Sequence, residues 1–91
     1  MSLILNNKLY NSRLIIGSGK YKNFNETKNA LKSSGAEMIT VAIKRTNLGQ
    51  DTNQENLLNF IDSKKYKILP NTAGCFTADD AIRVSLLGQE L

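Results

Sequence analysis

The sequence predicts an α/β fold in which a short β-hairpin precedes three β-strand–α-helix units. The run 13–16 is apolar after Arg13, and both faces of the run 38–43 are apolar or small, which is typical of strands in a buried parallel sheet. Helical periodicity follows each strand, and the strand starts near Arg13, Met38 and Ile68 are each about one βα unit apart. Alternating units of this kind form a parallel sheet with helices packed outside it.

The first elements have clear local signals. Two extended runs, 3–5 and 8–10, flank the pair Asn6-Asn7, which predicts a small hairpin. The first strand of the parallel sheet, 13–16, stops at Gly17-Ser18-Gly19. A helical stripe then consists of Phe24, Thr27, Ala30, Leu31 and Ser34.

Gly35 marks the carboxyl end of this first helix, predicted over 24–34, and the second strand follows at 38–43. Thr52 and Glu55 have the spacing of a capping box, which predicts a second helix. Its apolar face would consist of Leu57, Leu58 and Ile61.

The third unit begins at Lys67-Ile68-Leu69. Pro70 is expected to end the regular pairing of this strand, because proline has no N–H to donate. Thr77 and Asp80 then predict the start of a third helix. One face of that helix would carry Ala78, Ala81, Ile82, Ser85 and Leu86.

The predicted domain is incomplete. Each outer strand of a three-stranded parallel sheet leaves an unpaired edge, and the last helix reaches Gln89-Glu90-Leu91 without a clear cap. A complete βα barrel needs roughly 200 residues or more. Residues 1–91 are therefore expected to form a single incomplete domain; in a (β/α)8 TIM barrel, 91 residues would hold only the first three βα units.

Composition excludes several classes of protein. No run approaches the ~18 apolar residues of a membrane span. With one cysteine, Cys75, and no histidine, the chain has neither a disulfide framework nor the ligands of a structural zinc site. Met1 to Leu5 is too short for the apolar core of a signal peptide. We expect a soluble chain in a reducing compartment, with no metal and no cofactor.

The positive charge leaves one alternative open. Twelve Lys and Arg against eight Asp and Glu give a net charge of +4. Lys64, Lys65 and Lys67 surround Tyr66, which allows an RNA-binding hypothesis, but nucleic-acid readers usually show a denser stripe. A solvated connection between a helix and a strand is favoured, so no nucleic-acid partner is expected.

Enzymes built from βα units place their chemistry at the carboxyl ends of the strands. Gly17-Ser18-Gly19-Lys20 would let backbone N–H groups approach an anion, although it matches neither a Walker A loop nor G-x-G-x-x-G. Lys44-Arg45 could anchor an anionic substrate or pair with a neighbouring acid. Asn71-Thr72-Ala73-Gly74 suits a pocket wall and a structural turn equally.

Other reactive groups near these ends are expected to be structural. An imine-forming role for Lys20 or Lys44 needs a buried amine, and a lysine with its amine in water is favoured for each. Cys75 has no histidine to activate it. Asp79 and Asp80 stand in the first turn of the last helix, where acids complement the helix dipole, so they are not interpreted as a catalytic pair.

Three strings together resemble the thiazole synthase family. Residues 12–21, SRLIIGSGKY, are similar to its first barrel strand, and residues 33–45, SSGAEMITVAIKR, to its second strand. Residues 69–77, LPNTAGCFT, followed by ADDAIR, are similar to its third strand and third helix. The order and spacings also agree, and the similarity runs from about Leu3 to Glu90.

The resemblance implies a (β/α)8 barrel of about 250 residues that makes the thiazole phosphate of thiamine. The family's substrates are 1-deoxy-D-xylulose 5-phosphate, which forms an imine with a lysine, and dehydroglycine. Sulfur comes from a thiocarboxylated sulfur carrier protein. The full-length enzyme is expected to be a homo-oligomer without a membrane or nucleic-acid partner, in the bacterial cytoplasm or the plastid stroma.

The family's imine-forming lysine is expected just past Leu91, so no catalytic residue is assigned within this chain, and the chain alone is expected to be inactive. The positions carried over lie on the pocket side only: Gly17, Ser18, Gly19, Lys20, Lys44, Arg45, Asn71 and Thr72. The alternative is a structural or interaction module that completes a split barrel with a separate chain.

Overall fold

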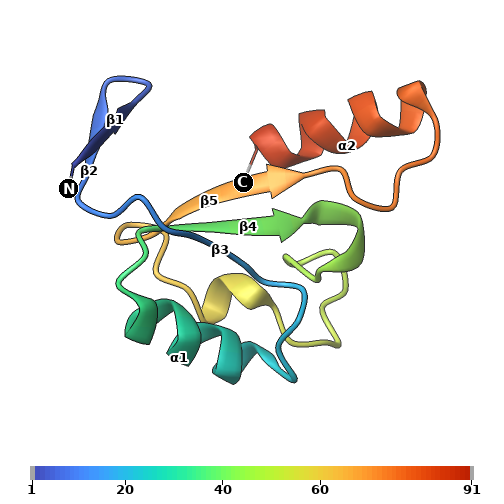
Figure 1. Ribbon diagram of the computed structural model, residues 1–91. Coiled ribbons are helices and arrows are strands. Elements are labelled where there is room, and N and C mark those ends of the chain that lie inside the picture. The colour runs from blue at the N-terminus through green and yellow to red at the C-terminus, as the bar shows by residue number, and fades with distance from the viewer. Residues whose placement is uncertain (1, 91) are drawn as a thin grey trace.

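The computed structural model describes residues 2–90 and contains two small sheets (Figure 1). Strands β1 (Leu3–Leu5) and β2 (Lys8–Tyr10) form an antiparallel hairpin, with Leu3 opposite Tyr10. Asn6 and Asn7 both have positive φ at its turn, 49° and 64°. Asparagine tolerates this left-handed conformation, which a two-residue type I′ hairpin turn requires at both central positions. The predicted hairpin is confirmed.

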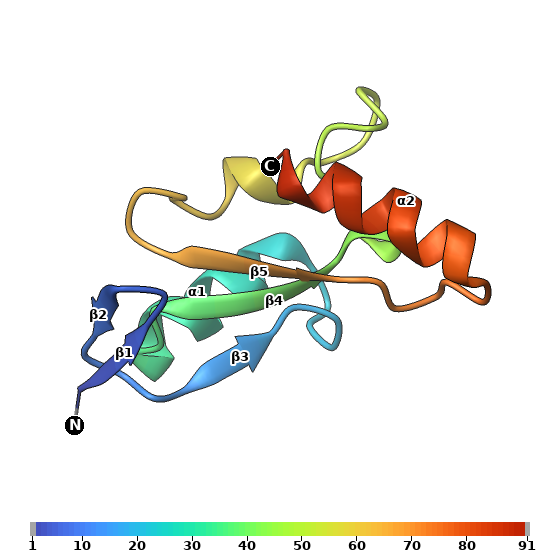
Figure 2. The same ribbon diagram turned by 90° about the horizontal axis from the view of Figure 1, so that it is seen from above.

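The second sheet is parallel and has the order β3-β4-β5, where β3 is Ile15–Gly17, β4 is Met38–Ala42 and β5 is Lys67–Asn71 (Figure 2). In register, Ile15 lies beside Met38, which lies beside Lys67. Because the strands are parallel, their carboxyl ends meet at one edge. A mixed α/β fold is therefore present, and its strands follow one another in the predicted order.

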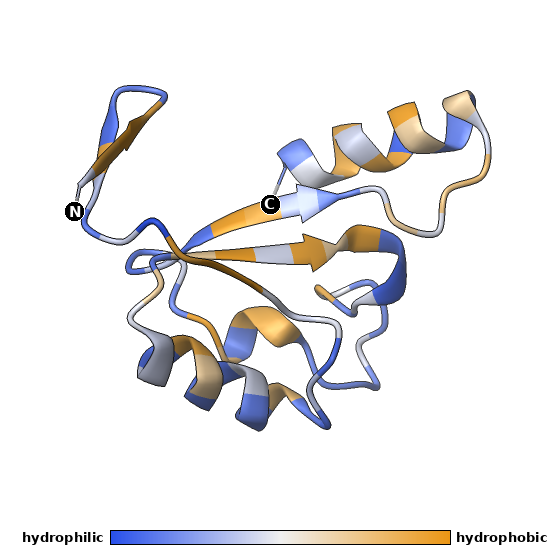
Figure 3. Ribbon diagram, viewed as in Figure 1, coloured by the Kyte–Doolittle hydropathy of each residue, from blue (hydrophilic) through white to orange (hydrophobic). Residues whose placement is uncertain are grey.

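One face of this sheet carries the core. Ile39 and Val41 of β4 are fully buried and pack with Leu31, Leu57 and other apolar residues. Figure 3 shows orange, apolar segments on β4 and on the elements that face it. The opposite face is more open, since Ile15 and Leu69 are each 44% exposed.

Helix α1 (Phe24–Ser34) matches its prediction residue for residue. The side-chain oxygen of Asn23 accepts the Glu26 N–H at 2.8 Å, which caps the first turn. Gly35 ends the helix with φ of 73°, a conformation that costs glycine little. Thr27 and Leu31 form the buried stripe of this helix.

The predicted second helix is wrong. Residues 46–66 form a loop that contains only a short 3-10 turn, η2 (Leu57–Asn59). Thr52 does not cap it; the side chain of Asn56 accepts the Leu58 N–H instead, at 2.9 Å. Leu57 and Ile61 are still buried in the core. The apolar spacing therefore predicted correctly which residues are buried, although the segment between them is not an α-helix.

The third strand of the parallel sheet also differs from expectation. The ladder between β4 and β5 continues through Pro70, opposite Val41, to Asn71. Residues of a parallel strand bond alternately to either side, so an edge strand tolerates a proline whose nitrogen points away from its neighbour. The strand therefore does not end at Pro70.

Helix α2 (Ala78–Gln89) begins where predicted, with Thr77 Oγ1 accepting the Asp80 N–H at 3.1 Å. Its buried residues are Val84 and Gly88, whereas Ile82 and Leu86 of the expected inner face are about 60% exposed. A Cβ on Gly88 would lie only 3.2 Å from Pro70 Cβ, so the glycine lets α2 approach β5 closely. This close approach determines which face is turned inward.

The hairpin is tied to the parallel sheet by one carboxylate. Glu37 Oε1 accepts the backbone N–H groups of Asn11 at 2.5 Å and Ser12 at 2.9 Å. Tyr10 is 5% exposed and lines a hollow with Ile15 and Met38. The hairpin thus covers the amino-terminal end of the open sheet face. Within residues 2–90, no helix has both the length and the apolar character to cross a membrane.

Candidate functional site at the carboxyl edge of the parallel sheet

Three loops leave the parallel sheet at one edge, after β3, β4 and β5 (Figure 2). The first loop is joined to the central strand by the hydroxyl of Ser18, which donates to the Thr40 carbonyl at 2.8 Å. Gly17 lies beside Thr40 in register, and a Cβ at position 17 would lie 3.6 Å from Thr40 Oγ1. A Cβ at position 17 would therefore meet Thr40 at an ordinary van der Waals distance.

An ion cluster joins the second loop to α2. The 3-10 turn η1 (Ile43–Arg45) follows β4 and carries Lys44, whose amine lies 2.7 Å from Asp80 Oδ2. Arg83, one turn further along α2, pairs with the other oxygen of the same carboxylate. The Asp80 side chain is 19% exposed and that of Lys44 is 43% exposed. Two cations and one carboxylate leave a net charge of +1 in the cluster.

The cluster changes the acidity of two groups. Hydrogen bonds from Lys44 and Arg83 lower the pKa of Asp80 from 3.8 to about 2, so its carboxylate stays charged at neutral pH. Burial raises the pKa of the Cys75 thiol, and the neighbouring Asp80 carboxylate raises it further. Cys75 is therefore a protonated thiol at neutral pH, which is a poor nucleophile.

The third loop is held by hydrogen bonds among its own residues. Asn71 Oδ1 accepts the Ala73 N–H at 3.1 Å, and the Thr72 carbonyl accepts the Cys75 N–H at 3.1 Å. Gly74 has φ of 89°, and Arg45 Nε would lie 3.0 Å from a Cβ at that position. The Arg45 side chain thus lies across the third loop, which connects it to the second.

The comparisons with known proteins assign a family. The family model "Thiazole biosynthesis protein ThiG" matches residues 4–91. The chain belongs to this family. Its relatives include thiazole synthase of Dechloromonas aromatica, 58% identical over 89 residues, and that of Aromatoleum aromaticum, 54% identical over 90 residues. Thiazole synthase of Acinetobacter baylyi is 56% identical over 89 residues.

These matches cover 98% or 99% of the chain and 34% of each of the three relatives. The chain therefore spans about a third of the length of the thiazole synthases it matches. The resemblance drawn from the three strings is confirmed, and the chain corresponds to the amino-terminal third of a thiazole synthase.

In this member of the family, three of the predicted site residues contact a neighbouring element. Ser18 bonds to β4, Lys44 to α2, and Arg45 lies against Gly74. Gly19 and Lys20 are exposed, and Lys20 makes no side-chain hydrogen bond within residues 2–90. Asp80 and Arg83 were missed as site residues. The sequence indicates only that Asp80 lies in the first turn of a helix. Its ion pair with Lys44 forms because the fold brings these two residues together.

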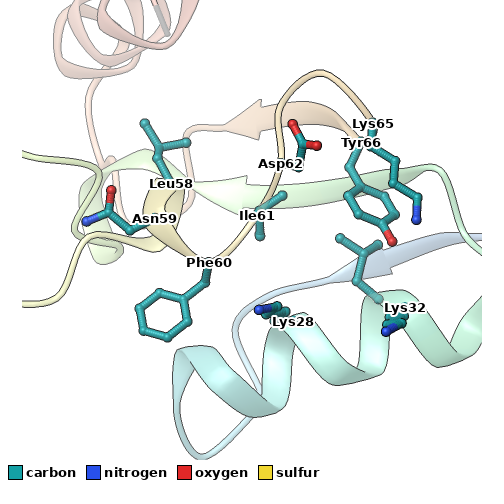
Figure 4. A pocket seen from close by; sticks show the side chains of 10 residues that line it. Lys28, Lys32, Leu58, Asn59, Phe60, Ile61, Asp62, Lys65 and Tyr66 are labelled. Carbon is teal, nitrogen blue, oxygen red and sulfur yellow. The ribbon is translucent and has the colours of Figure 1, made fainter.

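A separate hollow lies away from this edge, between α1 and the segment 58–66 (Figure 4). Its volume is about 390 Å³, and its lining residues include Lys28 and Lys32 of α1 and Lys65 of the facing segment. We call it the lysine groove. None of the pocket-side residues expected from sequence lines it.

Proposed function

We propose that residues 1–91 form the first three βα units of a thiazole synthase barrel. The parallel order β3-β4-β5 carries this proposal, because three polar loops meet at the edge where barrel enzymes place their sites. The open sheet face, with Ile15 and Leu69 half exposed, is the face that a closed barrel would enclose. The hairpin would cover its amino-terminal end.

The full-length protein would form the thiazole phosphate of thiamine from 1-deoxy-D-xylulose 5-phosphate, dehydroglycine and a sulfur carrier thiocarboxylate. A lysine amine beyond Leu91 would attack the ketone carbon, lose water and give the imine. Gly17, Ser18, Gly19, Lys20, Lys44, Arg45, Asn71 and Thr72 would line one side of the pocket. We further propose that the working enzyme is a homo-oligomer of the bacterial cytoplasm or the plastid stroma.

The test compares two proteins. The full-length protein that carries this chain is expected to produce thiazole phosphate from the three substrates, measured by liquid chromatography with mass detection. Residues 1–91 alone are expected to give no product above a protein-free control. An inactive full-length protein would contradict the assigned activity, and an active 91-residue chain would contradict the need for later strands.

The open face also favours a second candidate, an interaction module that completes a split barrel with a separate chain. Edge strands β3 and β5 leave backbone groups available for pairing. Co-expression with a fragment of a relative that starts after the matched third is expected to yield a co-purifying, active complex. Failure of the two pieces to associate would exclude this role.

A further inference from the structure

The lysine groove carries an inference that does not depend on the proposed enzyme activity. Leu58, Phe60 and Ile61 from the loop and Leu31 from α1 line its apolar part. Lys28 and Lys32 of α1 and Lys65 of the facing segment line the same hollow (Figure 4). Both sides of the groove come from this chain, on the sheet face opposite the open one. Its walls therefore need no further strand.

The charges of the groove are not balanced internally. Within residues 2–90 the ion pairs are Lys44–Asp80 and Arg83–Asp80, so the three groove lysines have no carboxylate partner in that range. Asp62 also lines the groove, but its Oδ1 accepts the Lys64 N–H at 2.9 Å and its carbonyl accepts two further N–H groups. Asp62 thus shapes the turn, and the lining keeps a net charge of +2.

Two of the lysines also repel each other. Lys28 and Lys32 are four residues apart on α1, and like charges at this spacing destabilise a helix. Lys65 adds a third positive charge from the facing wall. A bound carboxylate cluster would remove this repulsion.

We propose that the lysine groove binds an acidic peptide segment of another protein, with large apolar side chains inserted beside the lysines. The hollow of about 390 Å³ is large enough to accept such a side chain. The apolar lining supplies burial for it, and the lysines select for flanking carboxylates and fix orientation.

A peptide fits the groove better than RNA does. Sequence-tolerant RNA binding relies on exposed aromatic faces on which bases stack. Phe60 instead packs edge-to-face on Phe24, with ring centroids 5.7 Å apart. The Lys65 amine lies over the Tyr66 ring, 5.4 Å from its centroid. The two aromatic rings of the groove are therefore already engaged.

The test uses the full-length protein and a fluorescein-labelled nonapeptide of seven glutamates with a central Phe-Leu pair, followed by anisotropy at 50 mM salt. Lys28→Glu/Lys32→Glu is expected to weaken binding about tenfold or more, the scale of two close charge reversals. The control Lys8→Glu/Lys22→Glu makes the same charge change outside the groove and is expected to leave binding within about twofold. Circular dichroism checks that both variants fold.

A peptide with alanines in place of the Phe-Leu pair is expected to bind at least about fivefold more weakly, because the apolar anchor is lost. Equal losses in both double variants would overturn the proposal, since they would indicate general charge attraction. Absence of peptide binding to the unaltered protein would overturn it as well. So would a single-stranded RNA oligomer that binds more tightly than the peptide and loses affinity in the groove variant.

Discussion

The Lys44 amine lies 2.7 Å from the Asp80 carboxylate, and this ion pair joins the turn after β4 to the first turn of α2. Arg83 shares the same carboxylate, so Asp80 holds two cations at once. Lys44 is therefore not a free cation in this structure. Of the cations expected on the pocket side, Arg45 and Lys20 keep guanidinium and amine groups that no carboxylate within residues 2–90 neutralises.

Asp80→Asn is expected to lower the stability of the full-length protein at neutral pH. The folded pKa of Asp80, about 2, lies below its ordinary 3.8, so its stabilising effect is present above pH 4. That effect is lost as pH falls from about 4 to 2. Thermal unfolding across this range is expected to show the variant and the unaltered protein converging at low pH. Asp79→Asn, in the same turn but outside the ion pair, is the matched control; the same pH-dependent loss there would contradict this role for Asp80.

Gly74→Ala is expected to destabilise the protein by about 1–2 kcal/mol, because L-residues other than glycine are strained in the left-handed region. The residue has φ of 89°, and its new Cβ would crowd Arg45 Nε at 3.0 Å. Denaturant unfolding midpoints measure the effect. Gly19→Ala meets no atom within 4 Å and is the control, with little change expected. Equal midpoints for the two variants would show that the backbone at Gly74 is not constrained.

Thr77→Ala is expected to cost about 1 kcal/mol, the usual effect of removing an N-cap side chain. Thr77 Oγ1 accepts the Asp80 N–H, so the substitution frays the turn that positions the ion pair. Amide hydrogen exchange in the first turn of α2 is the direct measurement. Thr77→Ser keeps the acceptor and is expected to retain protection; comparable exchange in both variants would refute the cap.

Glu37→Ala is expected to release the amino-terminal hairpin from the parallel sheet. Two backbone N–H groups, of Asn11 and Ser12, would lose their acceptor, and hydrogen bonds to a charged group contribute about 1.5–3 kcal/mol. Exchange of these two amides and of residues 3–10 should accelerate. Glu37→Gln retains a neutral acceptor, so its amide exchange rates should lie between those of the unaltered protein and those of Glu37→Ala. Unchanged exchange in the alanine variant would show that another contact holds the hairpin.

Much of the fold could be predicted where a local signal coincided with burial. The Asn6-Asn7 turn, the α1 boundaries with Gly35 and the Thr77 cap each depend on nearest neighbours in sequence, and the structure has them all. The segment 52–61 could not be predicted correctly. Its apolar spacing reflects burial of Leu57 and Ile61, and Asn56 caps a single short turn where a capping-box helix was expected.

The inner face of α2 and the ion cluster could not be predicted from sequence, because both depend on contacts between residues far apart in the chain. Sequence hydrophobicity favoured Ile82 and Leu86, but the helix turns Val84 and Gly88 inward because Gly88 can lie against Pro70. The pairing of Lys44 with Asp80 spans 36 residues and depends on the crossover between strands. The eight pocket-side positions remain predictions, since only binding of substrate tests them.

Pro70 has a consequence for aggregation through the edge of the parallel sheet. An edge strand can pair with a strand of another molecule through its row of free N–H and C=O groups. Proline is one of the residues that disfavour such pairing. The β5 ladder with β4 runs through Pro70, so the donor missing at this position is missing from the outer side of the strand. An incoming strand of another molecule would find a gap in the middle of its hydrogen-bond row. Wherever β5 lies at an open sheet edge, this gap disfavours the addition of a strand from another molecule.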